Sequence, residues 1–270
     1  MKKIALTSLL AVFAVSGAHA ANVINNNPLY RPEAGQFYSV TSVDSHTENT
    51  KSVGLQEEFG YGITNRLAVS MSTGVEQSDW FDSAEWSDFN IGANFRALDM
   101  GNWKGDLYAG YGVAPIWGHN VYLVPGEKNV DFLDKDFTMY GWAVGARGGY
   151  ATDMWTVAGH VEFNYINTES FNWNDDGLHA ISAGVDGQLV LNQYWNLTAG
   201  AEYTGILDDK LWGAKIEHAG TWTAKFGANF NFDSDKFIGA YVSKEMSHAD
   251  AGKWEIADGF GFGATFGIQF

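Results

Sequence analysis

Residues 259–270, which read GFGFGATFGIQF, decide the fold class. Every second residue from Phe260 to Phe270 is apolar, and the residues between them are glycine, threonine or glutamine. A β-strand sends successive side chains to opposite faces, so this stretch has one apolar face and one small or polar face. Because the apolar face continues to a final aromatic residue, the pattern favours the closing strand of a transmembrane β-barrel over the edge of a soluble sandwich.

The same stretch resembles the assembly signal of bacterial outer-membrane proteins, which ends in an aromatic residue with hydrophobic residues at alternate positions before it. In this chain those positions are Phe266, Ile268 and Phe270. The resemblance implies that the barrel assembly machinery of a Gram-negative bacterium is a partner of this chain.

The N-terminal end predicts export. Lys2 and Lys3 precede a mostly apolar run over 4–15, and Ala18-His19-Ala20 follows as a small-residue cleavage site. That order is typical of a secretory signal peptide rather than a membrane helix. We therefore expect a signal peptide at 1–20, a periplasmic lead-in at 21–34 and a barrel at 35–270, placed in the cell outer membrane.

Composition excludes several classes of function. The 270 residues carry a formal net charge of −16, which argues against nucleic acid because phosphates would be repelled. There is no cysteine, so no disulfide framework is available. The 32 glycines and 15% aromatic residues suit barrel strands and interfacial girdles. The histidines are scattered, and we expect neither a metal nor a cofactor.

Alternating segments follow one another along the chain and predict an all-β, antiparallel, up-and-down transmembrane barrel of about twelve strands. Short connections, expected on the periplasmic side, alternate with longer external loops. The expected strands are 35–46, 51–62, 65–77, 86–96, 104–114, 136–150, 154–167, 178–191, 195–207, 215–232, 236–247 and 256–270.

The segment 51–62 contains one fault in its pattern. Glu57 shares a face with Leu55 and Phe59, where a barrel strand would meet lipid. A carboxylate at that depth is costly, so the sequence predicts a β-bulge at Glu57 and Glu58, or a position of Glu57 near the rim.

The first tight turn carries a family resemblance. Residues 58–67 read EFGYGITNRL, which resembles the strand–turn–strand signature of putative outer-membrane transporters grouped with the MetA pathway of phenol degradation. Residues 27–35 resemble the start of the same family. The resemblance implies an outer-membrane barrel that takes up small molecules, and it transfers no catalytic residue.

The polar faces of the predicted strands supply the candidate pore lining. Seven acids stand against four bases, which predicts a passage for small solutes that weakly prefers cations. The acids are Glu58, Glu76, Asp88, Asp106, Glu162, Asp186 and Glu202. The bases are Arg66, Arg96, Arg147 and Lys225, with His160 near neutral.

Two alternatives to a channel stay open. The first is a non-conducting structural or surface-interaction barrel, filled by ion pairs, in which the loop 115–135 meets a partner. The second is a barrel hydrolase: pairing the strands 154–167 and 178–191 sets His160 opposite Gly184 and Ser182 opposite Glu162, a grouping that acyl transfer needs. In every case we expect outer-membrane lipid and lipopolysaccharide outside the wall. For the channel, which is the preferred function, we expect no catalytic residue.

Overall fold

The structure is a computed structural model that describes residues 27–47, 52–78, 84–116, 137–167, 177–208, 210–211, 214–215, 219–248 and 259–270. The expected signal peptide, residues 21–26 and most of the predicted loop 115–135 lie outside these ranges. The described strands are β1 (Phe37–His46), β2 (Ser52–Gly62), β3 (Leu67–Ser78), β4 (Glu85–Met100), β5 (Trp103–Ile116), β6 (Phe137–Ala151), β7 (Trp155–Ile166), β8 (Leu178–Val190), β9 (Trp195–Ile206), β10 (Lys210–Leu211), β11 (Ala214–Lys215), β12 (Gly220–Asn231), β13 (Lys236–His248) and β14 (Gly259–Gln269).

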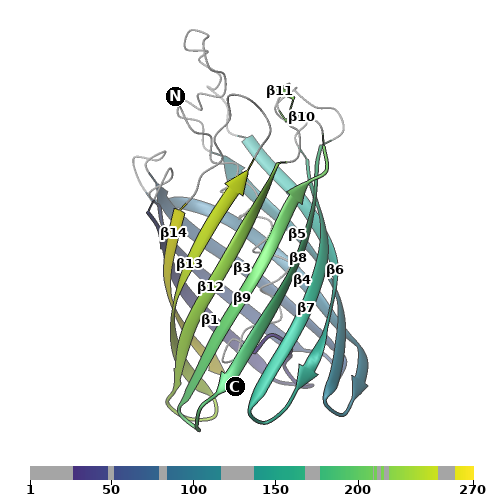
Figure 1. Ribbon diagram of the computed structural model, residues 1–270, viewed down its shortest axis with the longest axis vertical. Helices are drawn as coiled ribbons and strands as arrows, with labels where there is room; N and C mark the ends of the chain where they lie inside the picture. The colour runs from purple at the N-terminus through teal and green to yellow at the C-terminus, as the bar shows by residue number, and fades with distance from the viewer. Residues whose placement is uncertain are drawn as a thin grey trace.

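Twelve of these strands form one closed barrel (Figure 1) in the order β1-β14-β13-β12-β9-β8-β7-β6-β5-β4-β3-β2. Every neighbouring pair of strands in the barrel is antiparallel, and β1 closes the ring on β14 with Tyr38 opposite Gln269. The predicted all-β barrel of about twelve strands is confirmed. The small β10–β11 hairpin was not predicted, since residues 208–214 read as a loop. No helix among the described residues is long and apolar enough to cross a membrane.

Short turns gather at one end of the barrel, at the bottom of Figure 1, together with the C-terminus. Polar side chains fix them: Thr64 Oγ1 accepts the backbone N–H of Leu67 at 2.9 Å, and Asn192 Oδ1 accepts that of Trp195 at 3.0 Å. Outer-membrane barrels hold their short turns toward the periplasm. We call this end the short-turn end.

The two faces of the wall differ in chemistry. On β14 the outward residues Phe260, Phe262 and Phe266 are 46%, 50% and 43% exposed. Such exposure would be unfavourable in water, and it is what a lipid-facing band requires. Aromatic rings also meet near the short-turn end, where Tyr150 lies 5.0 Å from Trp103 and 5.4 Å from Trp155 between ring centroids. This clustering matches an interfacial aromatic girdle.

The predicted bulge at Glu57 is wrong. The register runs without a shift through Glu57, which pairs with Thr41 on β1 and with Thr73 on β3. The irregularities lie elsewhere, between Gly74 and Val75 against β4 and after Arg96 against β5. Glu57 therefore points outward near the middle of β2, where local hydroxyl groups take the place of a bulge: Ser39 and Thr41 each donate a 2.5 Å hydrogen bond to its carboxylate.

Candidate functional site in the barrel lumen

Most predicted pore-lining residues share the inward face of the wall. Arg66 is the exception, because it lies in the exposed turn before β3 at the short-turn end. Whether the others line an open passage remains a prediction. The inward residues are Glu58, Glu76, Asp88, Arg96, Asp106, Arg147, His160, Glu162, Asp186, Glu202 and Lys225.

An ion pair joins β4 to β5 close to the short-turn end. The Nε atom of Arg96 contacts Oδ1 of Asp106, and Nη2 lies 3.4 Å from Oδ2. Both side chains are buried. A buried guanidinium needs several acceptors to offset the loss of water, and one carboxylate supplies only part of that need.

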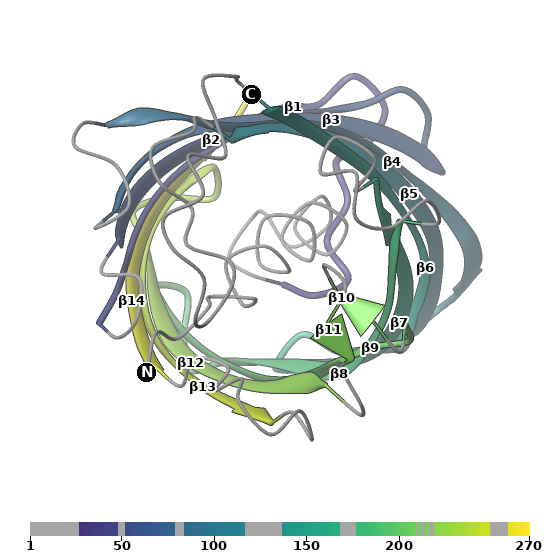
Figure 2. The same cartoon turned by 90° about the horizontal axis from the view of Figure 1, so that it is seen from above.

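The remaining acceptors come from a segment inside the barrel. Residues 27–36, which we call the strap, run within the ring of strands (Figure 2, purple segment) before β1 begins. Nη2 of Arg96 donates to the carbonyl oxygen of Leu29 at 2.8 Å, and Nη1 of Arg147 donates to that of Pro28 at 2.6 Å. Two arginines of the wall thus hold the backbone of the strap.

The strap also reaches the opposite side of the lumen. Tyr30 donates a 3.2 Å hydrogen bond from its hydroxyl to Oε1 of Gln269 on β14, and its ring packs edge-on against Tyr38 at 6.3 Å. Burial raises the pKa of the Tyr30 phenol, so the hydroxyl stays protonated and remains a donor. Since β14 and β6, which carries Arg147, lie six strands apart in either direction around the ring, the strap bridges opposite walls.

The base of the strap is fixed to the turn between β2 and β3. The backbone N–H of Gly35 donates to the carbonyl of Gly62 at 2.8 Å, and the N–H of Gly62 donates to the carbonyl of Gln36 at 2.9 Å. Gly35 has φ of 85°, a left-handed conformation that glycine adopts without a side-chain clash. Arg31 adds a 3.1 Å hydrogen bond to the carbonyl of Thr64.

Further from the short-turn end, His160 on β7 lies between two carboxylates. Its Nδ1 is 3.3 Å from Oδ2 of Asp186, and its Nε2 is 2.8 Å from Oε2 of Glu202. Carboxylates only accept hydrogen bonds, so both ring nitrogens must donate, and the imidazolium is the form that satisfies both contacts. The protonated ring then offsets part of the negative charge on this wall.

The predicted pairing of β7 with β8 is confirmed, with His160 opposite Gly184 and Glu162 opposite Ser182. The side chains, however, turn to other partners. Ser182 Oγ lies 2.8 Å from Oγ1 of Thr204, while His160 is engaged by its two carboxylates. The described contacts include no hydrogen bond between Ser182 and His160, so the nucleophile–base pair of an acyl-transfer site is not assembled.

Further titratable residues that were not predicted from the sequence also face inward, namely Asp44 and His46 on β1 and Glu245 on β13. Valine and tyrosine share the inward face of β1 with polar residues, which hid its alternation. The closing pair could have revealed it, because Asp44 lies opposite Gly263 on the small face of residues 259–270. With these residues included, and Arg66 at the rim, the excess of acids inside the wall is larger than predicted.

Comparison with known proteins finds similar barrels among solved structures. No family model and no curated protein matches the chain. Among solved structures, the COG4313 outer membrane channel from Pseudomonas putida F1 is similar with a TM-score of 0.58 and 12% identity, covering 89% of this chain and 97% of that one. The NanC porin is similar with a TM-score of 0.57 and 7% identity, covering 85% of this chain and 98% of that one.

The fold is that of a bacterial outer-membrane β-barrel. The translocator domain of the autotransporter NalP from Neisseria meningitidis is also similar, with a TM-score of 0.51, 14% identity and 89% of each chain covered. Identities this low show the fold alone. The outer-membrane barrel implied by the resemblance at residues 58–67 is confirmed, while membership of that transporter family remains a prediction.

Proposed function

We propose that this barrel is a passive outer-membrane channel for small polar solutes, with a preference for cations. The observation that supports it is the contrast between the two faces of one closed wall, with exposed apolar side chains outside and carboxylates inside. A low-dielectric wall strengthens the field of inward charges compared with the same charges on an open surface. The structural neighbours described as a channel and a porin support the same role.

The arginines near the short-turn end should oppose the passage of cations less strongly than their charge alone suggests. Arg96 is paired with Asp106 and bound to the strap, and Arg147 holds the carbonyl of Pro28. These contacts direct both guanidiniums toward protein acceptors. We infer that the selectivity depends on carboxylates that neither arginine pairs with, such as Glu58 and Glu202, and that solutes pass beside the strap.

We propose no enzymatic activity for this barrel. The side chains that a hydrolase would need, Ser182 and His160, are each engaged by other partners. The proposed partners are small solutes in the lumen, outer-membrane lipid and lipopolysaccharide around the wall, and the assembly machinery during insertion. Nucleic acid is not among them, given the acidic charge.

Two adjacent carboxylates provide a matched test. Glu58 faces inward and accepts a 2.8 Å hydrogen bond from Tyr38, while Glu57 faces outward. Purified protein in a planar bilayer should show discrete conductance steps and a cation-selective reversal potential under a salt gradient. Glu58→Gln should reduce that preference, whereas Glu57→Gln should leave it unchanged. Glutamine keeps the shape of the side chain and removes its charge, inside the barrel in the first variant and outside it in the second.

Ionic strength gives a second readout of the same proposal. The preference should weaken as salt rises, because the screening length falls from about 10 Å at roughly 0.1 M to about 3 Å at roughly 1 M. If correctly inserted protein passes no current, with the strap intact or released, the channel is excluded. The non-conducting structural barrel, with a partner at the loop 115–135, then becomes the favoured alternative. An anion preference would instead show that other residues line the passage.

A further inference from the structure

Lys225 lies on the inward face of β12, near the middle of the strand. Its Nζ atom is 3.7 Å from the centroid of the Tyr241 ring on the neighbouring strand β13. The ring lies against the wall because Gly263, opposite Tyr241 on β14, has no side chain: a Cβ atom there would be 2.3 Å from Cε1 of the tyrosine. The face of the ring therefore holds the ammonium group inside the barrel by a cation–π contact.

Lys225 differs from the other inward bases in its partners. Arg96 pairs with a carboxylate, His160 lies between two of them, and Arg147 donates to a carbonyl oxygen of the strap. Among the described contacts, Lys225 forms neither an ion pair nor a hydrogen bond. A ring face compensates a positive charge less completely than a carboxylate does, and an ammonium group has three N–H donors to satisfy.

The carboxylates nearest to Lys225 are engaged elsewhere. Asp186 and Asp44 act on its charge without contacting it. Asp186 lies 3.3 Å from Nδ1 of His160. Asp44 lies 3.6 Å from Nε2 of His46. Since Lys225 is also partly exposed to the lumen, its ammonium group is a charge that a passing ion meets without a contacting protein counter-ion.

The wall that carries Lys225 lies across the lumen from an anchor of the strap. β12 and β4, the strand of Arg96, are six strands apart in either direction around the ring (Figure 2). The described hydrogen bonds of the strap reach β4, β6, β14 and the turn between β2 and β3, and none of them reaches β12. A solute that passes beside the strap therefore moves along the side of Lys225.

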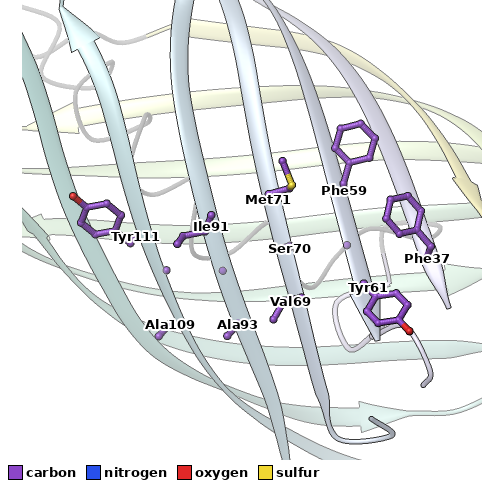
Figure 3. A pocket seen from close by; sticks show the side chains of 13 residues that line it. Phe37, Phe59, Tyr61, Val69, Ser70, Met71, Ile91, Ala93, Ala109 and Tyr111 are labelled. Carbon is purple, nitrogen blue, oxygen red and sulfur yellow. The ribbon is translucent and has the colours of Figure 1, made fainter. Parts of the chain in front are cut away.

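The outside of the wall offers no comparable route to a charged solute. Figure 3 shows a groove of about 630 Å³ on the outer face of β1–β5, lined by apolar side chains such as Phe37, Met71 and Tyr111. An ion would lose its water there and gain no polar partner. Ions are thus confined to the lumen, where Lys225 stands.

We propose that Lys225 makes the channel discriminate against divalent cations. The proposal rests on the passive channel proposed above, in which inward carboxylates concentrate cations of either valence. The ammonium group of Lys225 repels a divalent cation twice as strongly as a monovalent one, because the Coulomb energy scales with the product of the charges. The low-dielectric wall strengthens this repulsion. Monovalent cations and small neutral solutes pass Lys225, and Ca²⁺ and Mg²⁺ are held back.

A purely structural lysine is the alternative. Lys225 would then serve only to pack against Tyr241, and its removal would change the stability of the barrel without changing its selectivity. The partial exposure of Lys225 to the lumen and its lack of an ion pair favour a role in the ion path, because a structural charge inside a protein is normally paired.

The test is the ratio of Ca²⁺ to K⁺ permeability, measured as the reversal potential of purified protein in a planar bilayer between KCl and CaCl₂. Lys225→Met keeps an unbranched side chain and removes the charge, so the ratio should rise about three- to tenfold. Lys225→Glu reverses the charge and should raise the ratio further. Lys225→Arg keeps the charge and should leave the ratio close to that of the unmodified chain.

Lys244 provides a matched control, because it lies on the outward face of β13 with its Nζ atom 4.5 Å from the centroid of the Phe260 ring. Lys244→Met removes the same charge from the same kind of contact outside the barrel, and it should leave the permeability ratio unchanged. Tyr241→Leu should raise the ratio, since the ring holds the ammonium group in the path, whereas Tyr241→Phe should not. Heat-modifiable migration in gel electrophoresis reports that each variant is folded.

The outcomes separate this proposal from the channel itself. If the unmodified chain conducts and prefers cations, but Lys225→Met and Lys225→Glu keep its permeability ratio, the role of Lys225 is refuted and the channel stands. The same ratio change in Lys244→Met would also refute it, because the effect would not depend on a charge in the lumen. Absence of any current through the unmodified chain would overturn both proposals.

Discussion

Nη2 of Arg96 donates a 2.8 Å hydrogen bond to the carbonyl oxygen of Leu29, linking the barrel wall to the strap. The same guanidinium is paired with Asp106 on the neighbouring strand. One buried charge therefore holds two strands and an internal segment in a fixed relation. The position of the strap, and the width of passage left beside it, depend on this arginine.

Replacing Arg96 by lysine should loosen the strap without unfolding the barrel. Lysine keeps the charge for Asp106 but lacks the planar fork that reaches two acceptors at once. A hydrogen bond from a charged donor contributes about 1.5–3 kcal/mol, so release of the strap should become about ten- to hundredfold more frequent. Hydrogen exchange at the N–H of Tyr30, which donates to Asn27 at 3.0 Å, measures this opening.

Lys104→Arg serves as the control for Arg96→Lys, because Lys104 pairs with Asp99 and, among the described contacts, donates no hydrogen bond to the strap. Its exchange pattern in residues 27–36 should match the unmodified chain. Equal exchange in all three proteins would mean that Arg96 does not hold the strap.

Gly62→Ala should displace the base of the strap. A Cβ atom at this position would lie 1.8 Å from the carbonyl oxygen of Glu33, which leaves no room for a methyl group. Overpacking of this kind costs about 1–3 kcal/mol and should make the strap sensitive to added protease. Gly187→Ala is the matched control, since its Cβ would meet no heavy atom closer than 3.6 Å. Equal sensitivity of the two variants would contradict the contact.

Strict alternation made the barrel predictable from sequence. Residues 259–270 separate an apolar from a small face so cleanly that a strand with one lipid-facing side, observed as β14, follows directly. The inward carboxylates of strands with the same clarity, such as Glu202, were found for this reason. Asp44 was missed because the inward face of β1 mixes polar with apolar residues, and only pairing with β14 resolves it.

The strap and the hydroxyl contacts of Glu57 could not be derived from periodicity. Residues 27–36 have no alternation, and their place depends on Arg96 and Arg147, which lie more than sixty residues away along the chain. Glu57 broke the pattern of β2, and the sequence alone predicted either a backbone bulge or a position near the rim. The solution instead lies on the adjacent strand, where hydroxyls of Ser39 and Thr41 meet the carboxylate. Contacts between strands, unlike alternation within one, require the register.

Phe270→Asp should impair assembly of the barrel. The backbone of Phe270 exchanges hydrogen bonds with Phe37 at 2.8 and 3.2 Å, and the two rings lie 6.0 Å apart on the outward side. An aspartate would place a charge where the closing strands meet the interface. The heat-modifiable form in outer-membrane fractions should fall sharply, while Phe270→Tyr should retain it because tyrosine suits the interface. Normal accumulation of Phe270→Asp would contradict this role of Phe270.

Arginine placed on the two faces of the wall should have opposite consequences. Ala201 on β9 points outward between Val185 and Ala224, so Ala201→Arg would meet only apolar neighbours and lipid. Thr223 on β12 points inward between Glu202 and Glu245, so Thr223→Arg would meet a carboxylate on either side. Arginine on the lipid face near the midplane costs about 2–4 kcal/mol, whereas the inward arginine gains partners.

Denaturant unfolding of the two variants in lipid vesicles measures this difference directly. Ala201→Arg should lower the free energy of unfolding by about 2–4 kcal/mol. The free energy of unfolding of Thr223→Arg should stay close to that of the unmodified chain. In a planar bilayer, Thr223→Arg should also lower the cation preference, because it neutralises inward acids, while any Ala201→Arg that inserts should keep it. Equal losses of stability would mean that the faces of β9 and β12 are reversed, and an unchanged preference in Thr223→Arg would mean that Glu202 and Glu245 do not border the ion path.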